Sequence, residues 1–301
     1  MSSATYQSLT SDSSDLSSAG VQSKNLSDQD LQRAEGCLQI VLKGSDKGTR
    51  LVDFFQRSPI RMMFPTVDGA TKEAVLVNTA GGIAGGDRIE IRVTAVMNAS
   101  IAITSQAAEK VYRALDQPAC ISTKLTVGDS ARLSWLPQET IAFNHGQLSR
   151  KTEIECSSGA ELLALEWLVL GRTAYGEEMV AGQITDSWRL KRDGQLAWAD
   201  TFRITTEVFP QLRRKSLLAN CKAVGTMVYM GPCVDSKLKF LTDIVGSLEC
   251  CCAVTVVSEV IVVRFAAEDA SDMRLALRNL LRQANQELRD DLFRVPKMWS
   301  C

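Results

Sequence analysis

The chain has 301 residues, and its 34 Lys and Arg side chains are balanced by 35 Asp and Glu side chains. This length allows one large domain or two ordinary ones, with a sizeable core in either case. The near-neutral balance argues against a nucleic-acid-binding field and against a polybasic surface for anionic membranes. The longest apolar run near the C-terminus, 253–265, contains Ser258, Glu259 and Arg264 and is too short and too polar to span a bilayer.

The first 30 residues are rich in serine and aspartate and almost lack bulky apolar side chains. Such a segment cannot bury enough surface to order itself, so we expect a disordered tail over 1–30 and a single domain over 31–301. The tail lacks the apolar centre of a secretory signal and has no arginine before Arg33, which argues against an organelle transit peptide. We therefore expect a cytoplasmic protein.

The nine cysteines fit that compartment as free thiols. Cys250, Cys251 and Cys252 are consecutive and lead into a strand-like run, and adjacent residues on a strand point to opposite faces, so the three cannot all face one metal ion. There is no Cys-x-x-Cys pair, and His145 is the only histidine. A zinc site of the usual spacing is therefore excluded.

The chain from residue 37 to residue 204 reads as strand after strand. Short candidates at 37–41, 52–55 and 74–77 precede a run at 89–95 that alternates between apolar and polar residues. Turn residues then predict three hairpins, which pair 121–127 with 131–136, 151–156 with 160–170, and 187–191 with 195–204. The last contains Asp193-Gly194, the strongest hairpin signal in the chain.

A weak internal repeat runs through this region. Ala99, Ala131 and Ala160 each follow a polar turn, open a strand and lie roughly 30 residues apart, a period that can indicate stacked sheet layers. Each of these strands is followed by a glutamate, at a drifting offset: Glu109, Glu139 and Glu166.

The last third differs from the rest of the chain. A strand at 224–229 is followed by apolar residues at helical spacing over 234–248, then by a strand at 260–265 and a longer amphipathic helix over 273–288. Glu268 and Asp269 stand at the positive N-terminal end of that second helix, and we expect the ordered pattern to end at Pro296. The sequence thus predicts a mainly β fold with two late helices.

A glycine-rich stretch at 78–87 lies between two predicted strands and contains Gly81, Gly82, Gly85 and Gly86. A dinucleotide fingerprint would open a helix, and a phosphate-binding loop would place Lys and Ser or Thr where Asp87 and Arg88 stand. Two interpretations remain open. The stretch is a tight connection that uses positive φ angles, or its backbone is bare because something must approach it closely.

Among side chains that could carry chemistry, the carboxylates stand out. Glu139 and Glu166 lie in strongly apolar surroundings, where a carboxylate must be paired, protonated or bound to a cation. Arg113, Arg150 and Arg172 could each supply a structural partner. A hydrolase triad has little support, because the only histidine lies in a turn and no serine occupies a nucleophile elbow.

Several blocks together resemble the UreD (UreH) family of urease accessory proteins. The stretch Asn-Thr-Ala-Gly-Gly-Ile-Ala-Gly-Gly-Asp at 78–87 is similar to the glycine signature of that family. Further matching blocks follow in the same order at 104–113, 135–141, 170–177, 262–264 and 296–299. The departures are modest, such as Lys297 where the family often has arginine, and His145 lies at a position where the family varies and inherits no role.

The resemblance implies a fold of two β-sheets stacked in a helical-turn, solenoid-like arrangement with two C-terminal α-helices. It also implies a urease maturation chaperone rather than an enzyme. Such a protein would bind UreF and, through it, UreG, and would dock on the structural subunits of apo-urease. It would convey Ni²⁺ through its interior and hold no cofactor tightly.

With one histidine and no cysteine cluster, a nickel route through this chain must be lined by oxygen atoms, which bind nickel more weakly than imidazole or thiolate. Our hypothesis for this transient path names five carboxylates: Asp87, Glu109, Glu139, Glu166 and Glu177. Two other functions stay open. One is a structural clamp between UreF and urease that binds no metal, and the other is an enzyme that uses a carboxylate pair on a β scaffold.

Overall fold

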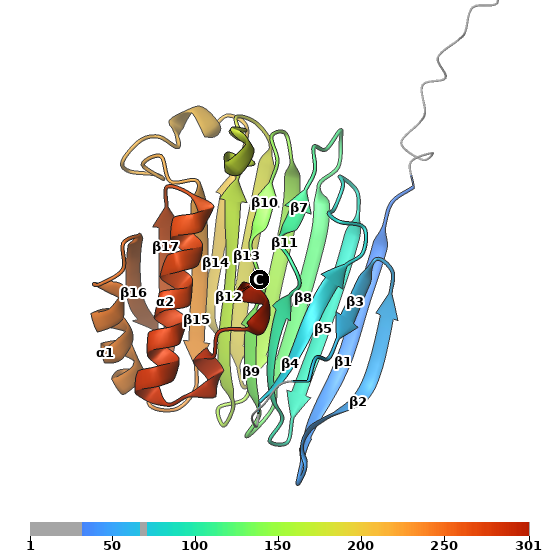
Figure 1. Cartoon of the computed structure of the whole chain (residues 1–301), viewed down its shortest axis with the longest axis vertical. Helices are drawn as coiled ribbons and strands as arrows, with labels where there is room; N and C mark the ends of the chain where they lie inside the picture. Colours follow the sequence, from blue (N-terminus) through green and yellow to red (C-terminus); the bar gives the residue numbers. More distant parts are fainter. Residues whose placement is uncertain (1–31, 67–70, 301) are drawn as a thin grey trace, which may run out of the picture. The chain divides into compact units, whose positions relative to one another are not determined.

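Two β-sheets, joined by a shared apolar core, form the main body of the protein in a computed structural model that describes residues 32–66 and 71–300 (Figure 1). The described residues from Arg33 onward group into one compact unit. The serine-rich tail expected over 1–30 lies outside the described residues. Within them, neither helix combines the length and apolar character needed to cross a membrane.

The first sheet, sheet A, has seven strands in the order β14-β13-β11-β8-β5-β1-β2. Its strands are β1 (Glu35–Ser45), β2 (Gly48–Arg57), β5 (Arg88–Val96), β8 (Ala119–Val127), β11 (Gln147–Cys156), β13 (Gln183–Arg192) and β14 (Gln195–Ile204).

The second sheet, sheet B, follows the order β16-β17-β15-β12-β9-β6-β4-β3, with two short strands, β7 and β10, alongside. Its main strands are β3 (Ile60–Met63), β4 (Lys72–Asn78), β6 (Ser100–Ser105), β9 (Arg132–Leu136), β12 (Glu161–Leu170), β15 (Ala223–Met230), β16 (Cys251–Val257) and β17 (Val260–Ala267). The short strands are β7 (Glu109–Val111) and β10 (Thr140–Ala142).

The chain alternates between the two sheets, so that β5, β8, β11 and β13 run parallel in sheet A while β4, β6, β9 and β12 run parallel in sheet B. Each pair of successive strands is one turn of a coil, and the coils stack. The predicted architecture of two stacked sheets in a solenoid-like arrangement, with two helices late in the chain, is confirmed.

The weak repeat in the sequence marks these coils. Ala99, Ala131 and Ala160 are completely buried at corresponding positions of successive coils. The backbone N–H of Arg132 donates to Ala99 O at 2.7 Å, and that of Glu161 donates to Ala131 O at 2.9 Å. Complete burial at these stacked corners favours a small residue, which accounts for the recurring alanine.

Two of the three predicted hairpins are wrong. The segments 121–127 and 131–136 lie in β8 of sheet A and β9 of sheet B, and 151–156 and 160–170 lie in β11 of sheet A and β12 of sheet B. In both cases the turn carries the chain from one sheet to the other. The two strands therefore face each other across the core instead of pairing through backbone hydrogen bonds. The third hairpin, β13–β14 around Asp193-Gly194, is confirmed as an antiparallel pair.

Both predicted helices are present, as α1 (Val234–Val245) and α2 (Ala270–Leu288). The buried stripe of α2, including Met273, Leu277 and Leu280, forms a second core with residues of sheet B such as Trp167. Asp269 begins the helix, because its carboxylate accepts hydrogen bonds from the backbone N–H groups of Ser271 and Asp272. Short 3-10 turns also occur at η2 (Thr173–Tyr175), η3 (Phe209–Gln211), η4 (Asp291–Phe293) and η5 (Lys297–Ser300).

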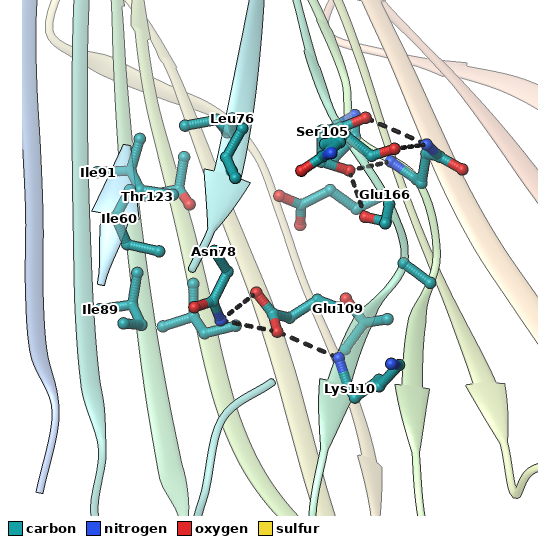
Figure 2. Close-up of a pocket in the computed structure, with 18 of the residues that line it drawn as sticks. Ile60, Leu76, Asn78, Ile89, Ile91, Ser105, Glu109, Lys110, Thr123 and Glu166 are labelled. Atoms are coloured by element: carbon teal, nitrogen blue, oxygen red, sulfur yellow. Dashed lines mark hydrogen bonds between the residues drawn. The ribbon is translucent and has the colours of Figure 1, made fainter. Parts of the chain in front are cut away.

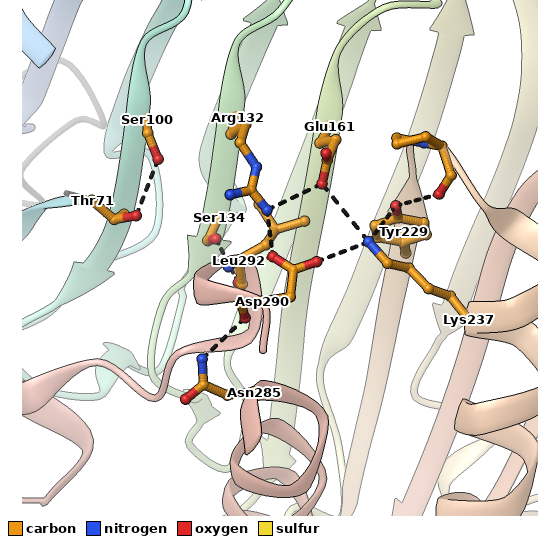
Figure 3. Close-up of polar contacts among 11 residues, drawn as sticks. Thr71, Ser100, Arg132, Ser134, Glu161, Tyr229, Lys237, Asn285, Asp290 and Leu292 are labelled. Carbon is orange, nitrogen blue, oxygen red and sulfur yellow. Dashed lines mark hydrogen bonds and ion pairs between the residues drawn. The ribbon is translucent and has the colours of Figure 1, made fainter. Parts of the chain in front are cut away.

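The expectation that order ends at Pro296 is wrong. After α2 the chain turns back onto sheet B, and Trp299 in η5 is buried, with its Nε1 donating to Leu136 O at 3.1 Å. Figure 3 shows how this return is anchored: Asp290 forms an ion pair with Arg132 and another with Lys237, the latter at 2.8 Å. Ser134 Oγ donates to Leu292 O at 2.7 Å. The sequence pattern missed this segment because the contacts that hold it on sheet B, to Arg132, Ser134 and Leu136, are long-range.

Candidate functional site

A cavity of about 170 Å³ lies between the two sheets and is a candidate site. Its walls are mainly apolar and come from both sheets: Ile60, Leu76, Ile89, Ile91, Ile121 and Trp135. Two carboxylates, Glu109 and Glu166, open onto the same space (Figure 2). An apolar cavity with a few convergent polar groups is the usual form of a small-ligand or ion site.

Glu109 begins β7, next to the glycine stretch. Both of its carboxylate oxygens lie 3.0 Å from Asn78 Nδ2, and Oε1 also accepts from the backbone N–H of Lys110 at 3.1 Å. Burial raises the pKa of Glu109, and the hydrogen bonds from Asn78 and Lys110 oppose that rise only in part. Asn78 Nδ2 also donates to Gly82 O at 3.2 Å, so one amide couples this carboxylate to the glycine stretch.

Glu166 lies on β12 and is almost fully buried. Its carboxylate accepts from Trp135 Nε1 at 2.9 Å and from Thr152 Oγ1 at 3.0 Å, and it lies 3.3 Å from Arg150 Nε. Burial raises the pKa of Glu166, and the charge of Arg150 opposes this. The group is therefore held in place by three elements, β9, β11 and β12.

Arg150 serves two carboxylates at once. Its Nε and Nη2 donate to the carboxylate of Asp186 at 2.8 and 2.7 Å, and its Nε also faces Glu166. All three side chains are more than 90% buried. One cation against two carboxylates leaves an excess negative charge beside the cavity, and in low dielectric such a charge favours uptake of a proton or a metal cation.

The other three predicted carboxylates do not line this cavity. Asp87 accepts from the backbone N–H groups of Ala34 and Ala84, both at 2.8 Å, and so closes the turn that leads into β5. Glu139 forms an ion pair with Arg274 of α2, and its second oxygen is buried with no hydrogen-bond partner among the described residues.

Glu177, the last of the five, pairs with Arg172 and accepts from Asn144 N at 2.9 Å near the surface. The structure thus brings together Glu109 and Glu166, and it places Asp87, Glu139 and Glu177 in separate contacts. Across the described residues, no three His, Cys, Asp or Glu side chains are arranged to hold a metal ion.

The four glycines form the crossover from β4 in sheet B to β5 in sheet A. Gly81 and Gly86 have positive φ angles of 74° and 86°. A Cβ atom on Gly82 would lie 2.5 Å from the ring of Tyr112, and one on Gly85 would lie 2.5 Å from Gln117 O. Two of the four glycines thus have positive φ angles, and the other two lie against residues of the chain's own next coil.

Arg150 is among the cations expected to pair with a buried carboxylate, and the sequence also contains a signal for its partner Asp186. In β11, residues 148, 150, 152 and 154 share the inward face, and in β13 residues 184, 186, 188 and 190 do the same. A charged residue on the apolar face of an alternating strand must find a buried partner. The alternating patterns of the two strands together indicate that Arg150 and Asp186 pair with each other.

Comparisons with known proteins agree with this architecture. The family model described as UreD urease accessory protein matches residues 34–300. The chain is 37% identical over 270 residues to "Urease accessory protein UreD" of Rhizobium johnstonii, an alignment that covers 89% of this chain and 96% of that protein. It is 38% identical to the protein of the same name from Mesorhizobium japonicum, covering 89% and 95% of the two chains. The match extends over both sheets and the late helices, and the chain therefore belongs to the UreD family of urease accessory proteins.

Proposed function

We propose that this chain is a urease maturation chaperone that docks on apo-urease together with UreF and UreG. In this role it conveys Ni²⁺ to the urease active site in the cytoplasm and performs no reaction of its own. Family membership supports the role in maturation, since relatives that are 37% and 38% identical to it over 270 residues are named urease accessory proteins. The observation that carries the nickel route is the pair Glu109 and Glu166 on one internal cavity.

The chemistry of these two groups suits transient transport. Carboxylate oxygens bind Ni²⁺ more weakly than imidazole or thiolate, so the ion can leave again. The mainly apolar walls offer the ion few competing ligands, while the unbalanced charge of Asp186 and Glu166 against Arg150 offsets part of the cost of bringing a cation inside. Glu109 and Glu166 are the residues that would contact the ion in this cavity.

Asp87, Glu139 and Glu177 would have to give up existing contacts to bind nickel. Asp87 would release two backbone N–H groups, and Glu177 would release Arg172. Glu139 has one free oxygen, yet it faces α2 and not the cavity. We therefore rank these three below Glu109 and Glu166 as members of the path.

The alternative is a clamp that joins UreF to urease and carries no metal. The complete set of hydrogen bonds around Glu166 favours this reading, because a purely structural carboxylate would have the same partners.

The deciding experiment is activation of apo-urease at limiting nickel with purified maturation proteins. Glu109→Gln and Glu166→Gln should lower the nickel content of urease at least tenfold, while Glu153→Gln, on the outward face of β11, should not change it. Calorimetric titration of the purified chain with Ni²⁺ should show weak binding that both cavity variants abolish. If all variants load urease normally and the chain binds no Ni²⁺, the clamp is correct and the nickel route is wrong.

A further inference from the structure

The two ends of the stack of coils differ, because helices cover one end and apolar side chains are exposed at the other. At one end, α1 and α2 cover the last strands of sheet B. At the other end, around β2 and β3, six large apolar side chains are exposed, and we call this set the open end: Leu51, Val52, Phe54, Phe55, Met63 and Phe64. Terminal units of stacked-coil proteins usually carry a polar outer face, and contiguous exposed apolar side chains mark interaction sites.

A β-bulge concentrates apolar side chains on β2. The register between β1 and β2 shifts at Val41/Leu42, so that Ile40 pairs with Phe54 and Leu42 pairs with Leu51. Ile40 and Leu42 are buried and face the core. Leu51 and Phe54 therefore lie on the same inward side although they are three residues apart, and Phe55 lies on the opposite side. The inward side of this edge strand is therefore apolar, and Phe55 on the outward side stands among the charged residues Arg50, Asp53 and Arg57.

Two side chains of β2 form hydrogen bonds with sheet B, one near each end of the strand. Gln56 Oε1 accepts from the backbone N–H of Met62 at 3.0 Å, and Thr49 Oγ1 accepts from Ser100 N at 2.7 Å. Between these two contacts, the rings of Phe54 and Phe64 pack edge to face with centroids 6.0 Å apart, and both side chains remain partly exposed. The centre of the strand is left as an exposed apolar strip along a free sheet edge.

Three cations beside this strip, Lys43, Arg50 and Arg61, form no ion pair with the described residues, whereas Arg57 at the end of β2 pairs with Glu35. Lys43 and Arg50 are directly opposite each other in the β1–β2 register. Like charges at such positions repel, and in the described part of the chain neither side chain forms an ion pair. Arg61 on β3 also has no carboxylate partner there. Carboxylates on a bound segment would relieve this repulsion.

We propose that the open end docks an extended, apolar segment of a protein partner whose flanking residues are acidic. The segment would lie along the free edge of β2, cover Leu51, Val52 and Phe55, and place carboxylates near Arg50 and Lys43. A protein segment fits better than an anionic membrane, because an added strand can pair with backbone N–H and C=O groups along the edge and lipid cannot; among these groups, the Phe54 N–H already donates to Asp53 Oδ1 at 2.9 Å. Asp53, at the centre of the strip, would also be repelled by an anionic bilayer.

This inference rests on the proposed function in one respect: the partner is sought among the maturation proteins. The probes are purified UreF, UreG and apo-urease from the same source, each tested separately against the full chain. Val52→Ser/Phe55→Ser removes two side chains that are 54% and 53% exposed, and Arg50→Glu reverses the charge. Leu196→Ser is the matched control, because Leu196 is 55% exposed on β14, the opposite edge of the same sheet.

We expect one probe to bind at least tenfold more weakly to both β2 variants than to the wild-type chain, because residues at the centre of an interface carry most of the binding energy. The same probe should bind the Leu196→Ser control with an affinity within twofold of wild type. Amide hydrogen exchange of 48–57 should slow in that complex, which side-chain contact alone would not produce. Unchanged binding of all three probes to the β2 variants overturns the inference and leaves the nickel route intact.

Other occupants would also overturn it. A concentration-dependent dimer that the β2 variants abolish would assign the strip to a second copy of the chain. Binding to phosphatidylserine vesicles that the same variants abolish would assign it to a membrane. If wild-type chain binds none of the three probes, both this inference and the proposed docking fail.

Discussion

Arg150 on β11 and Glu166 on β12 meet between the two sheets, with Arg150 Nε 3.3 Å from the glutamate carboxylate. The two strands belong to different sheets, so this contact joins the two layers at the wall of the cavity. Because Asp186 takes the bidentate position on the same guanidinium, Glu166 is the less strongly paired of the two carboxylates.

Replacing Arg150 should be severely destabilising. Arg150→Met leaves two buried carboxylates without their cation, and the loss of one partner from a buried ion pair costs about 3–5 kcal/mol of unfolding free energy. Urea unfolding followed by circular dichroism measures it. Arg92→Met is the control, because Arg92 pairs with Glu90 at the exposed surface, where the loss should be below about 1 kcal/mol. Equal losses in the two variants would contradict the buried-charge argument.

The raised pKa of Glu109 predicts a definite pH dependence. A carboxyl group with a higher pKa in the folded state binds more protons folded than unfolded, so stability falls as pH rises from about 4.5 through the folded pKa. Glutamine does not titrate, so Glu109→Gln removes this pH-dependent loss of stability. The free energy of unfolding of the variant, relative to wild type, should therefore increase between pH 4 and pH 7.

Urea unfolding at several pH values tests this prediction. Glu153→Gln, on the outward face of sheet A, should show no comparable trend. A difference between Glu109→Gln and wild type that stays constant with pH would mean that burial does not perturb this carboxyl group.

Trp299 should contribute to stability despite its position near the C-terminus. Its side chain is buried, and its Nε1 donates to Leu136 O and to Thr104 Oγ1. Trp299→Ala should cost about 3–5 kcal/mol of unfolding free energy, as for large-to-small changes in a core. Leu275→Ala, at an exposed position of α2, should cost far less. A small effect of Trp299→Ala in urea unfolding would show that the segment is not packed onto sheet B.

The N-cap of α2 predicts a smaller and pH-dependent effect. Asp269→Ala removes the acceptor for the N–H groups of Ser271 and Asp272 and should cost about 0.5–2 kcal/mol. The hydrogen bond from Asp272 N is the main cause of the lowered pKa of Asp269, with Ser271 contributing as well. The contribution is therefore present above the ordinary pKa of 3.8 and is lost as pH falls below it through the folded pKa.

Thermal unfolding at pH 7 and at pH 2.5 measures this change. Asp269→Asn keeps an oxygen acceptor without the charge, so it should lose less stability at pH 7 than Asp269→Ala does. A penalty for Asp269→Ala that is the same at both pH values would contradict the ionic contribution to the cap.

The sequence by itself determined the positions of most strands, the two helices, the β13–β14 hairpin and the alanine repeat. These features depend on local period, turn chemistry and the capping residue Asp269, all of which act within a few residues. The resemblance of blocks along the chain also identified the family.

Only the tertiary structure decided which strands are neighbours and which side chains meet. A turn such as Gly128-Asp129 connects two strands equally well within one sheet or across the core, and the choice depends on coils far apart in the sequence. For the same reason Glu109 and Glu166 share a cavity, whereas Glu139 turns to Arg274. The direction of a side chain in stacked coils is set by long-range pairing, which local pattern does not encode.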